Sequence, residues 1–458
     1  MYSLDDTIAA ISTPIGEGGI GIVRLTGPEA REILDRIFAP GADRSQAELE
    51  PRLLHYGHII DPASRQVVDE VLAVHMPAPR TYTRQDMVEI QGHGGIVALR
   101  AILSLCLRQG ARLAEPGAFT ARAFLNGRLD LAQAEAVLDV VQARTDVSLE
   151  AAIGQLAGRL SDQVRSVRAS LMEALAYLEA SLDFAEDEIP EREIGADMEQ
   201  AVAHLSGLLQ EAERGIIYRQ GIRAAIVGRP NVGKSSLLNR LLRTSRAIVT
   251  HIPGTTRDTL EETVNLQGVP VVLVDTAGIT NESEDIIERL GIERSRAALS
   301  QSDLALLVLD ASQPPTEADR AIAGIVDGKP SVVILNKIDL TDAVDYDTAS
   351  ILDAPAVRVS ALTGTGIEDL EQTIVDAVFS GEVVAAEPPA VTSPRHKEAL
   401  ARALDHARAA LSGHRAGLLP DLIAIDLSAA VNALGEITGQ TAGEDLVEMI
   451  FSKFCVGK

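Results

Sequence analysis

The sequence predicts a multidomain α/β and α+β protein, in which a doubly wound α/β domain interrupts a helical domain that follows an N-terminal α+β domain. Three observations predict this arrangement. Residues 228–235 read Gly-Arg-Pro-Asn-Val-Gly-Lys-Ser and stand between an apolar run and a helical pattern. Further apolar runs of strand length follow this stretch. Alanine and leucine recur at helical spacing before and after it, which indicates that the α/β domain is inserted into one helical domain.

Composition limits the class of protein. The 458 residues exceed what one ordinary core holds, so several domains are expected. The formal net charge of −25 argues against indiscriminate nucleic-acid binding, because neutralising phosphates needs clustered Lys and Arg, and the aromatic content of 3% argues against base-stacking surfaces. The two cysteines fit a reducing compartment, and we recognise neither a membrane-length apolar run nor a signal peptide. We therefore expect a cytoplasmic protein without membrane contact.

Residues 1–118 are expected to form the α+β domain. A glycine-rich turn at residues 16–19 enters a strand, and further strands are expected at residues 71–75 and 87–91. The turn is not a dinucleotide fingerprint, because the helix and the distant acidic residue of that motif are missing. Cys106 lies in an apolar run and is expected in the core.

The helical domain is expected in two parts, residues 119–217 and residues 382–458. The second part begins with a linker rich in Pro, Ala and Val at residues 382–394, and an acidic stretch at residues 183–193 is expected to be a solvated loop. Helices are expected at residues 129–143, 147–182, 198–218, 397–411, 422–437 and 443–454.

Residues 228–235 match a phosphate-binding loop, with two glycines in the required spacing before Lys and Ser. The glycines let the backbone approach phosphates, and several N–H groups converge on the anion at a helix N-terminus. Lys234 is expected to reach the terminal phosphates and Ser235 to ligate magnesium. The alternative is an ordinary glycine-rich turn. The apolar run at residues 222–227 and the helical pattern at residues 236–242 favour the phosphate loop.

Later motifs indicate which nucleotide is bound. The strand at residues 271–274 ends in Asp-Thr-Ala-Gly, where Asp275 is expected in the magnesium shell and the amide of Gly278 at the last phosphate. A strand at residues 332–335 ends in Asn-Lys-Ile-Asp. Asp339 can accept from the N1–H and the exocyclic amine of guanine, which adenine does not offer.

The guanine-nucleotide domain is completed by two more expected strands. One covers residues 304–309, and the other covers residues 357–360 and leads into a loop placed to touch the guanine oxygen. We therefore assign residues 218–381 to a doubly wound, phosphate-loop GTPase domain.

The chain resembles the family of tRNA modification GTPases called MnmE or TrmE. Residues 454–458 read Phe-Cys-Val-Gly-Lys, residues 129–136 read Leu-Asp-Leu-Ala-Gln-Ala-Glu-Ala, and helical segments flank the GTPase domain. The resemblance covers essentially the whole chain. It implies a potassium-activated GTPase that, with an FAD-dependent partner protein, modifies carbon 5 of the wobble uridine (position 34) of certain tRNAs to a (carboxymethyl)aminomethyl-type group.

The resemblance also implies cofactors and assembly. A tetrahydrofolate derivative of the 5-formyl or 5,10-methylene type would supply the one-carbon unit, bound by the N-terminal domain at residues 1–118, which would also form the homodimer. The partner protein and the dimer would make a heterotetramer or a larger complex that acts on tRNA. GTP hydrolysis would drive a conformational change.

The resemblance assigns folate contacts to Arg24, Glu89, Arg128 and Lys458. A carboxylate can accept from the pterin N–H groups, and Arg or Lys can pair with the glutamate tail. The alternative for each residue is an ordinary surface charge.

Cys455 matches a catalytic or redox-relevant cysteine of the family. A thiolate is a good nucleophile, and Lys453 and Lys458 lie close in sequence. The alternative is a tail cysteine that is exposed or packed beside Phe454, and the chemical role stays open.

The resemblance assigns the GTPase chemistry as well. Ser235 and Thr256 match magnesium ligands, and Glu288 matches the residue that orients the attacking water, because Ile279 stands where Ras-like GTPases carry glutamine. His251 and Thr280 depart from the usual family residues, Asp and Arg. Potassium ligands are expected at Asn231, Thr250, Ile252 and Thr255. GTP contacts are expected at Asn231, Val232, Gly233, Lys234, Ser235, Ser236, Thr250, His251, Ile252, Pro253, Gly254, Thr255, Thr256, Asp275, Thr276, Ala277, Gly278, Asn336, Lys337, Asp339, Ser360, Ala361 and Leu362.

A second function class stays open at this point. A regulatory switch GTPase that binds RNA or protein in ribosome assembly would carry the same nucleotide motifs and perform no modification. The folate-type residues and the cysteine-bearing tail favour the modification enzyme.

Overall fold

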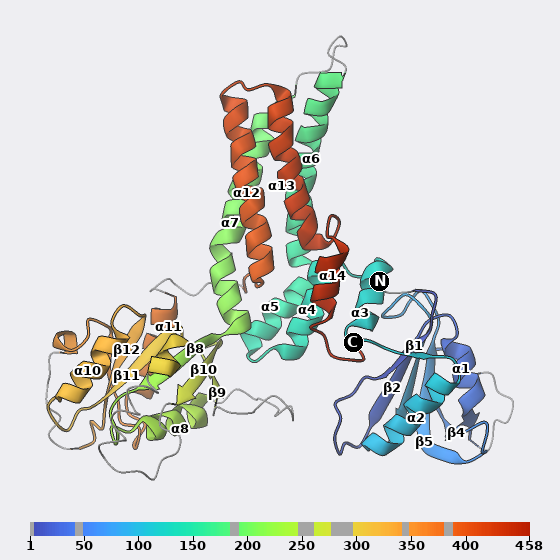
Figure 1. Ribbon diagram of the computed structural model, residues 1–458, viewed down its shortest axis with the longest axis horizontal. Coiled ribbons are helices and arrows are strands. Elements are labelled where there is room, and N and C mark those ends of the chain that lie inside the picture. The colour runs from blue at the N-terminus through green and yellow to red at the C-terminus, as the bar shows by residue number, and fades with distance from the viewer. Residues whose placement is uncertain are drawn as a thin grey trace. The chain divides into compact units, whose positions relative to one another are not determined.

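The computed structural model describes residues 4–41, 49–183, 192–245, 261–275, 296–340, 348–379 and 388–458 (Figure 1). The chain forms two compact units, each built from segments that are distant in sequence. The three boundaries expected between the four segments of the chain stay a prediction. The first unit comprises Met1–Leu138, Leu156–Ile194 and Ala409–Lys458, and the second comprises Asp139–Gln155 and Gly195–Arg408.

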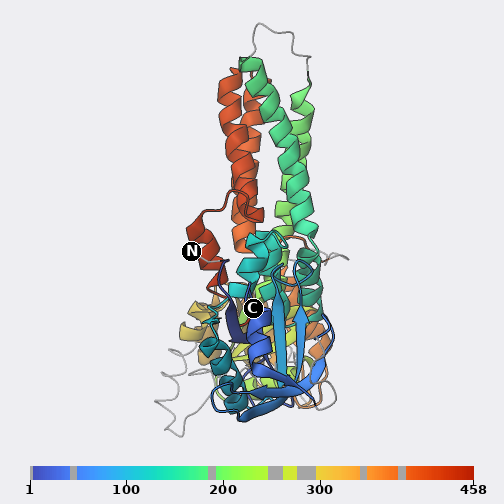
Figure 2. The same ribbon diagram turned by 90° about the vertical axis from the view of Figure 1, so that its right-hand side faces the viewer.

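The first unit contains a mixed sheet in the order β3-β4-β5-β6-β2-β1-β7. All its pairings are antiparallel except that of β1 with β7. Figure 2 shows the blue strands of this sheet running alongside one another. Its strands are β1 (Ile8–Ile11), β2 (Gly21–Thr26), β3 (Phe38–Pro40), β4 (His55–Ile60), β5 (Val67–Met76), β6 (Met87–Gly92) and β7 (Arg112–Leu113).

Alternation along β2 separates a core face from a polar face. Val23 and Leu25 are fully buried under the helices α1 (Ala30–Ile37) and α2 (Ile96–Arg108), and Arg24 between them faces the other side. Cys106 of α2 is buried as expected, and burial raises the pKa of its thiol to about 12. The sheet therefore presents Arg24 away from its core.

Besides α1 and α2, the first unit contains the helices α3 (Ala118–Leu125), α6 (Arg159–Asp183), α13 (Pro420–Thr438) and α14 (Glu444–Phe451), with most of α4 (Leu131–Gln142). Helices α6 and α13 lie side by side (Figure 1), and Arg168 Nε donates to Val431 O at 3.2 Å. The prediction of one helix over residues 147–182 is wrong. Helix α5 (Asp146–Leu156) ends before Gly158, whose φ of +99° is left-handed, and α6 begins after it.

The second unit contains a sheet in the order β13-β12-β11-β8-β10-β9. All pairings are parallel except that of β9, an antiparallel edge strand that the sequence did not predict. The expected strand at residues 357–360 is too long, because pairing ends at Arg358. The strands are β8 (Ile222–Val227), β9 (Glu261–Leu266), β10 (Val269–Asp275), β11 (Leu304–Asp310), β12 (Ser331–Asn336) and β13 (Ala356–Arg358).

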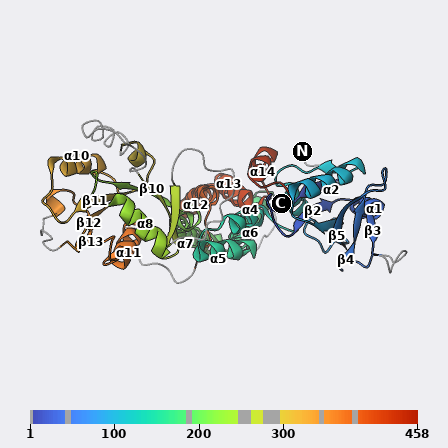
Figure 3. The same cartoon turned by 90° about the horizontal axis from the view of Figure 1, so that it is seen from below.

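Helices cover both faces of this sheet, which agrees with the doubly wound class. Leucines of α8 (Lys234–Ser245) and α11 (Ile367–Val378) join the core on one face, and α10 (Glu317–Val326) packs on the other. Figure 3 shows α10 separated from α8 and α11 by the strands. Every residue of β11 is buried, as a strand covered on both faces requires.

Part of the expected linker at residues 382–394 is a packed segment. Val391 and Thr392, which precede α12 (Pro394–Arg415), are buried, and Thr392 Oγ1 donates to Gln155 Oε1 at 2.9 Å. Val391 packs against α7 (Ile194–Gln220). The Val391 carbonyl lies so close to Gly215 that no Cβ would fit there. The linker prediction is therefore wrong for residues 388–393, and residues 382–387 lie outside the described residues.

A buried guanidinium joins α3 to the N-terminal sheet. Arg122 is 1% exposed and donates to Asp6 O, Thr26 O and Gln85 Oε1, and it pairs with Asp6 Oδ1 at 2.5 Å. Burial acts to raise the pKa of Asp6, but the hydrogen bond from Arg112 and the charge of Arg122 outweigh it and hold that pKa below its ordinary value. A carboxyl with a depressed folded-state pKa stabilises the fold above its unfolded pKa, and this stability is lost as the pH falls.

We predict that Arg122→Met lowers the free energy of unfolding of the first unit by about 3 kcal/mol, because it removes the guanidinium donor from three buried or half-buried acceptors and from one oxygen of the Asp6 carboxylate. Urea denaturation followed by circular dichroism measures the change. Arg112→Met is the matched control: it removes the exposed partner of the same Asp6 and is expected to cost less than about 1 kcal/mol. Equal effects of the two substitutions would contradict the role given to Arg122.

Candidate functional site

The loop between β8 and α8 has the backbone that a phosphate loop needs. Gly228 and Gly233 have φ of +150° and +99°, and a Cβ on Gly233 would lie 2.3 Å from the side-chain nitrogen of Asn336. Lys234 Nζ donates to the carbonyls of Gly228 at 2.7 Å and Arg229 at 2.9 Å. The lysine ammonium is thus held over the loop, where an incoming phosphate would take over its donors.

Asn231 has a left-handed backbone at the exposed tip of this loop, with φ of +65°. Asparagine tolerates this conformation better than most residues with a Cβ. The loop therefore presents the Asn231 amide to solvent, one residue before the buried Val232.

The carboxyl ends of four strands meet at one edge of the sheet, where ligands bind in doubly wound folds. The phosphate loop follows β8, and β10, β11 and β12 end at Asp275, Asp310 and Asn336. Sequence reasoning did not select Asp310, although it ends a fully apolar strand. Burial opposes ionisation of Asp310, but hydrogen bonds from Lys337 at 2.7 Å and Ser312 at 2.6 Å hold the pKa of this carboxyl below its ordinary value.

Asn336 connects the phosphate loop to a second loop, formed by Ser360, Ala361 and Leu362, which we call the base loop. The Asn336 Nδ2 donates to Val232 O at 2.9 Å, and its Oδ1 accepts from Ala361 N at 3.0 Å. Asp339 Oδ1 accepts from Ser360 Oγ at 2.6 Å. The structure thus brings Lys234, Asn336, Asp339 and the base loop together, and their roles as nucleotide contacts stay a prediction.

Many of the predicted nucleotide and metal residues lie outside the described residues, so their roles stay predictions. Of the expected metal ligands, Asn231 and Ser235 are described, and both offer neutral oxygens. Among the described ranges, no group of three or more His, Cys, Asp or Glu side chains could hold a metal ion. The predicted residues outside the described ranges are Thr250, His251, Ile252, Pro253, Gly254, Thr255, Thr256, Thr276, Ala277, Gly278 and Glu288.

A second polar cluster lies on the first unit, on the face of β2 and β6 opposite the core. Arg24 and Glu89 are directly paired across the two strands, and Glu89 Oε1 accepts from Arg24 Nε at 2.9 Å and Nη2 at 2.8 Å. Arg24 Nη1 also donates to Gly457 O at 3.2 Å. The C-terminal tail therefore reaches the N-terminal sheet of its own chain.

The tail is fixed by its backbone. Gly457 has φ of +93°, and a Cβ there would lie 2.7 Å from Ile11 O. Gly117 N donates to the backbone oxygen of Cys455 at 3.3 Å. The side chain of Cys455 is exposed. Burial, followed by the nearby Arg24 charge, lowers the pKa of Lys458. Lys458 therefore lies close to Arg24, directly after the residue whose carbonyl Arg24 binds.

Tyr82, a residue that the sequence analysis did not select, connects Arg128 to this cluster. The Arg128 guanidinium lies 4.8 Å from the centre of the Tyr82 ring, and Tyr82 Oη is 2.9 Å from Thr120 Oγ1. Burial raises the pKa of Tyr82, although the charges of Arg128 and Arg24 act against it. The four residues predicted for folate thus lie around one sheet face. We call Arg24, Tyr82, Glu89, Arg128 and Lys458 the Arg24 cluster.

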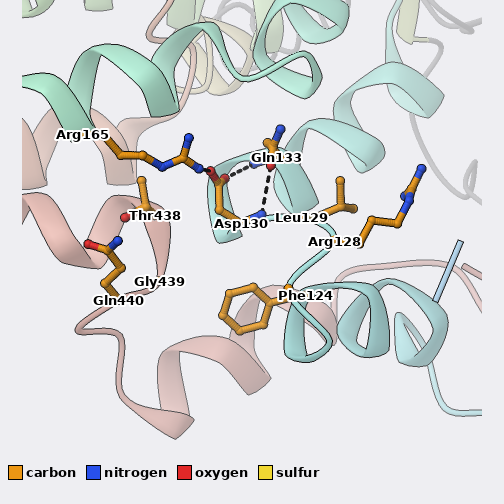
Figure 4. Close-up of a pocket in the computed structure, with 10 residues that line it drawn as sticks. Phe124, Arg128, Leu129, Asp130, Gln133, Arg165, Thr438, Gly439 and Gln440 are labelled. Carbon is orange, nitrogen blue, oxygen red and sulfur yellow. Dashed lines mark hydrogen bonds and ion pairs between the residues drawn. The ribbon is translucent and has the colours of Figure 1, made fainter. Parts of the chain in front are cut away.

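A hollow of about 310 Å³ opens beside Arg128 (Figure 4). Its polar groups largely satisfy one another: Asp130 Oδ2 pairs with Arg165 Nη2 at 2.5 Å, and Asp130 and Gln133 exchange bonds that cap α4. Figure 4 shows the Arg128 side chain turned away from Asp130 and Arg165. Arg128 therefore belongs to the Arg24 cluster and not to the centre of this hollow. The lining residues are Phe124, Gly127, Arg128, Leu129, Asp130, Gln133, Arg165, Thr438, Gly439 and Gln440.

Comparison with known proteins gives two family matches and many full-length relatives. The family model described as the MnmE helical domain matches residues 131–455, and that of the GTP-binding protein TrmE N-terminus matches residues 7–128. The tRNA modification GTPase MnmE of Roseiflexus sp. (strain RS-1) is 52% identical over 99% of both chains. The same enzyme of Chloroflexus aurantiacus is 50% identical over 99% of this chain and 100% of its own.

Among solved structures, the G domain of the T. maritima FeoB iron transporter is 28% identical. The match covers 34% of this chain and 98% of that domain, with a TM-score of 0.27. Within the described residues, no helix is both long and apolar enough to cross a membrane.

We predict that Asp339→Asn lowers GDP affinity at least tenfold, because the guanine N–H donors lose an ionised acceptor. The amide complements the extra carbonyl of xanthine, so the variant should prefer the xanthosine nucleotide. Titration calorimetry with GDP and XDP measures the preference. Asp353→Asn, at an exposed position of the same domain, is the control. An Asp339→Asn protein with the wild-type preference would remove this residue from base recognition.

Proposed function

The chain belongs to the MnmE family of tRNA modification GTPases, and on this premise we propose that it hydrolyses GTP in order to modify carbon 5 of the wobble uridine in certain tRNAs. The added group is of the (carboxymethyl)aminomethyl type. A tetrahydrofolate derivative donates the one-carbon unit, and an FAD-dependent protein is the partner. The homodimer forms through the N-terminal domain, and the complex works on tRNA in the cytoplasm.

The observation that carries the GTPase assignment is the Asn336 bridge. It connects the loop that holds Lys234 to the base loop, and Asp339 projects beside the base loop with Ser360 bonded to it. A phosphate-binding loop and a carboxylate suited to guanine therefore belong to one site. This arrangement supports GTP as the substrate.

Lys234 would exchange the Gly228 and Arg229 carbonyls for the terminal phosphates of GTP, where its charge stabilises the transition state. Ser235 and Thr256 would hold magnesium, and Glu288 would orient the attacking water. Asn231, Thr250, Ile252 and Thr255 would hold potassium through neutral oxygens. Potassium, when bound, supplies positive charge at the phosphates in place of an arginine finger.

The Arg24 cluster supports a reduced folate as the second ligand. The described hydrogen bonds of the Glu89 carboxylate all go to Oε1, so Oε2 is available to the N–H donors of a pterin. Tyr82 holds the Arg128 guanidinium by its ring face, and Arg128 has no carboxylate partner among the described residues. Arg128 and Lys458 can therefore pair with the carboxylates of a glutamate tail.

The tail also supports a role for Cys455 in the modification. Its backbone is bonded to Gly117, close to the Arg24 cluster, while its thiol faces solvent. A thiol so placed is accessible to a macromolecular substrate or to the partner protein. We assign Cys455 to the modification chemistry and not to GTP hydrolysis.

The alternative of a switch GTPase without modification chemistry is less well supported. It leaves the Arg24–Glu89 pair, the Tyr82-held Arg128 and the fixed tail without a ligand. The nucleotide site fits both functions. The Arg24 cluster and the tail of the first unit therefore favour the modification enzyme over the switch GTPase.

We predict that GTP hydrolysis is faster in potassium than in sodium at equal ionic strength. Glu288→Ala should abolish most of this turnover and leave GTP affinity nearly unchanged, because orienting water matters mainly in the transition state. Phosphate release and nucleotide titration measure the two quantities. Equal rates in both salts, or a parallel loss of binding and turnover in the variant, would contradict these assignments.

A matched pair of tail variants tests the second ligand. Deleting residues 456–458 should weaken binding of 5-formyltetrahydrofolate, because Arg24 loses the Gly457 carbonyl and the site loses Lys458. Cys455→Ser should retain folate binding and GTP hydrolysis but abolish tRNA modification in a strain without the native gene. Titration and nucleoside analysis give the readouts. Full modification by Cys455→Ser would remove the thiol from the mechanism.

A further inference from the structure

An arginine of the GTPase domain, Arg240, contacts the base loop directly. Arg240 lies on α8, six residues after Lys234 and therefore about 9 Å further along the same helix. Its Nε donates to Ala361 O at 2.9 Å, and its Nη2 donates to Leu362 O. The helix that begins at the phosphate loop thus reaches the base loop in its second turn.

The guanidinium of Arg240 donates its described hydrogen bonds to this loop alone. These hydrogen bonds go to the two consecutive carbonyls. A Cβ on Gly364, the residue that continues the base loop, would lie 3.5 Å from Arg240 Nη1. A planar guanidinium bound to two neighbouring carbonyls fixes both the position and the tilt of that backbone.

The Ala361 residue is held from both sides. Its N–H donates to Asn336 Oδ1, and its carbonyl accepts from Arg240 Nε. Leu362 is 77% exposed, so packing contributes little to holding the next residue in place. Polar anchoring therefore decides where this part of the loop lies.

We propose that Arg240 is a positioning residue for guanine recognition, a role that rests on the proposed binding of GTP. It holds the base loop in the geometry that meets the guanine oxygen before the nucleotide arrives. A loop fixed in advance loses less conformational entropy on binding, and that difference appears as affinity. Because α8 also carries Lys234, the base and phosphate ends of the site are kept at a set separation.

The test compares Arg240→Met with the wild-type full chain. Methionine keeps much of the apolar stem and removes both donors. We expect GDP and IDP to bind about tenfold more weakly, because both nucleotides offer the same base oxygen to the loop. Their affinity ratio should stay as in the wild type, since the amine that distinguishes them is read by Asp339. The KM for GTP should rise with kcat unchanged.

Two further variants complete the experiment. Arg240→Lys keeps one donor and should recover part of the lost affinity. Arg243→Met, at an exposed position of the same helix without a described contact to the base loop, should bind GDP as the wild type does. Wild-type GDP and IDP affinities in Arg240→Met would overturn the role of Arg240 alone. A wild-type protein that binds GDP no more tightly than ADP would overturn the guanine assignment and this role together.

Discussion

The buried side-chain amide of Asn336 is the interaction on which the nucleotide site depends. It is 2% exposed, and both of its polar atoms are bonded, one to the phosphate loop and one to the base loop. An unsatisfied amide at this depth would cost about 1–3 kcal/mol, so both loops are held to its geometry. The same amide explains why residue 233 is glycine, because a Cβ there would collide with it. One buried group therefore sets the loop conformation, the glycine and the pairing of the two loops.

In both units, an arginine side chain binds a backbone carbonyl and so holds an irregular segment in place. Each has a segment without helix or strand structure that lies close to a site: the base loop in one unit and the C-terminal tail in the other. In each, an arginine from a regular element donates to a backbone carbonyl of that segment, Arg240 to Ala361 and Arg24 to Gly457. The planar guanidinium offers several N–H donors in a fixed geometry, which suits it to bind a backbone carbonyl. Side chains on rigid elements thus position segments that contribute backbone groups.

Sequence patterns predicted the features that are local and missed those that depend on tertiary contacts. The buried parallel strands read as continuous apolar runs, and the phosphate loop carries its own glycine spacing, so both were predicted correctly. Strand β9 was missed because Glu262, Thr263 and Asn265 give it no apolar run. The packed residues 388–393 carry linker composition, and only the close approach to Gly215 makes them part of the core. Tyr82 and Arg240 were missed because their partners lie far away in sequence.

The turn between β9 and β10 shows how the nucleotide domain is joined to the helices of its own unit. Thr145 Oγ1 donates to Gly268 O at 2.8 Å, and the side chain of Val147 lies against Gly268, whose φ is +94°. Thr145 in turn exchanges hydrogen bonds with Ser148 in the first turn of α5. In sequence, β9 follows the segment that contains Thr256, and β10 precedes the segment that contains Glu288. The hairpin that separates the predicted magnesium ligand Thr256 from the predicted catalytic Glu288 in sequence is therefore anchored at its turn to the start of a helix. Any displacement of this hairpin that accompanies a change of nucleotide must either break that contact or move α5, because a packed contact of this kind does not stretch.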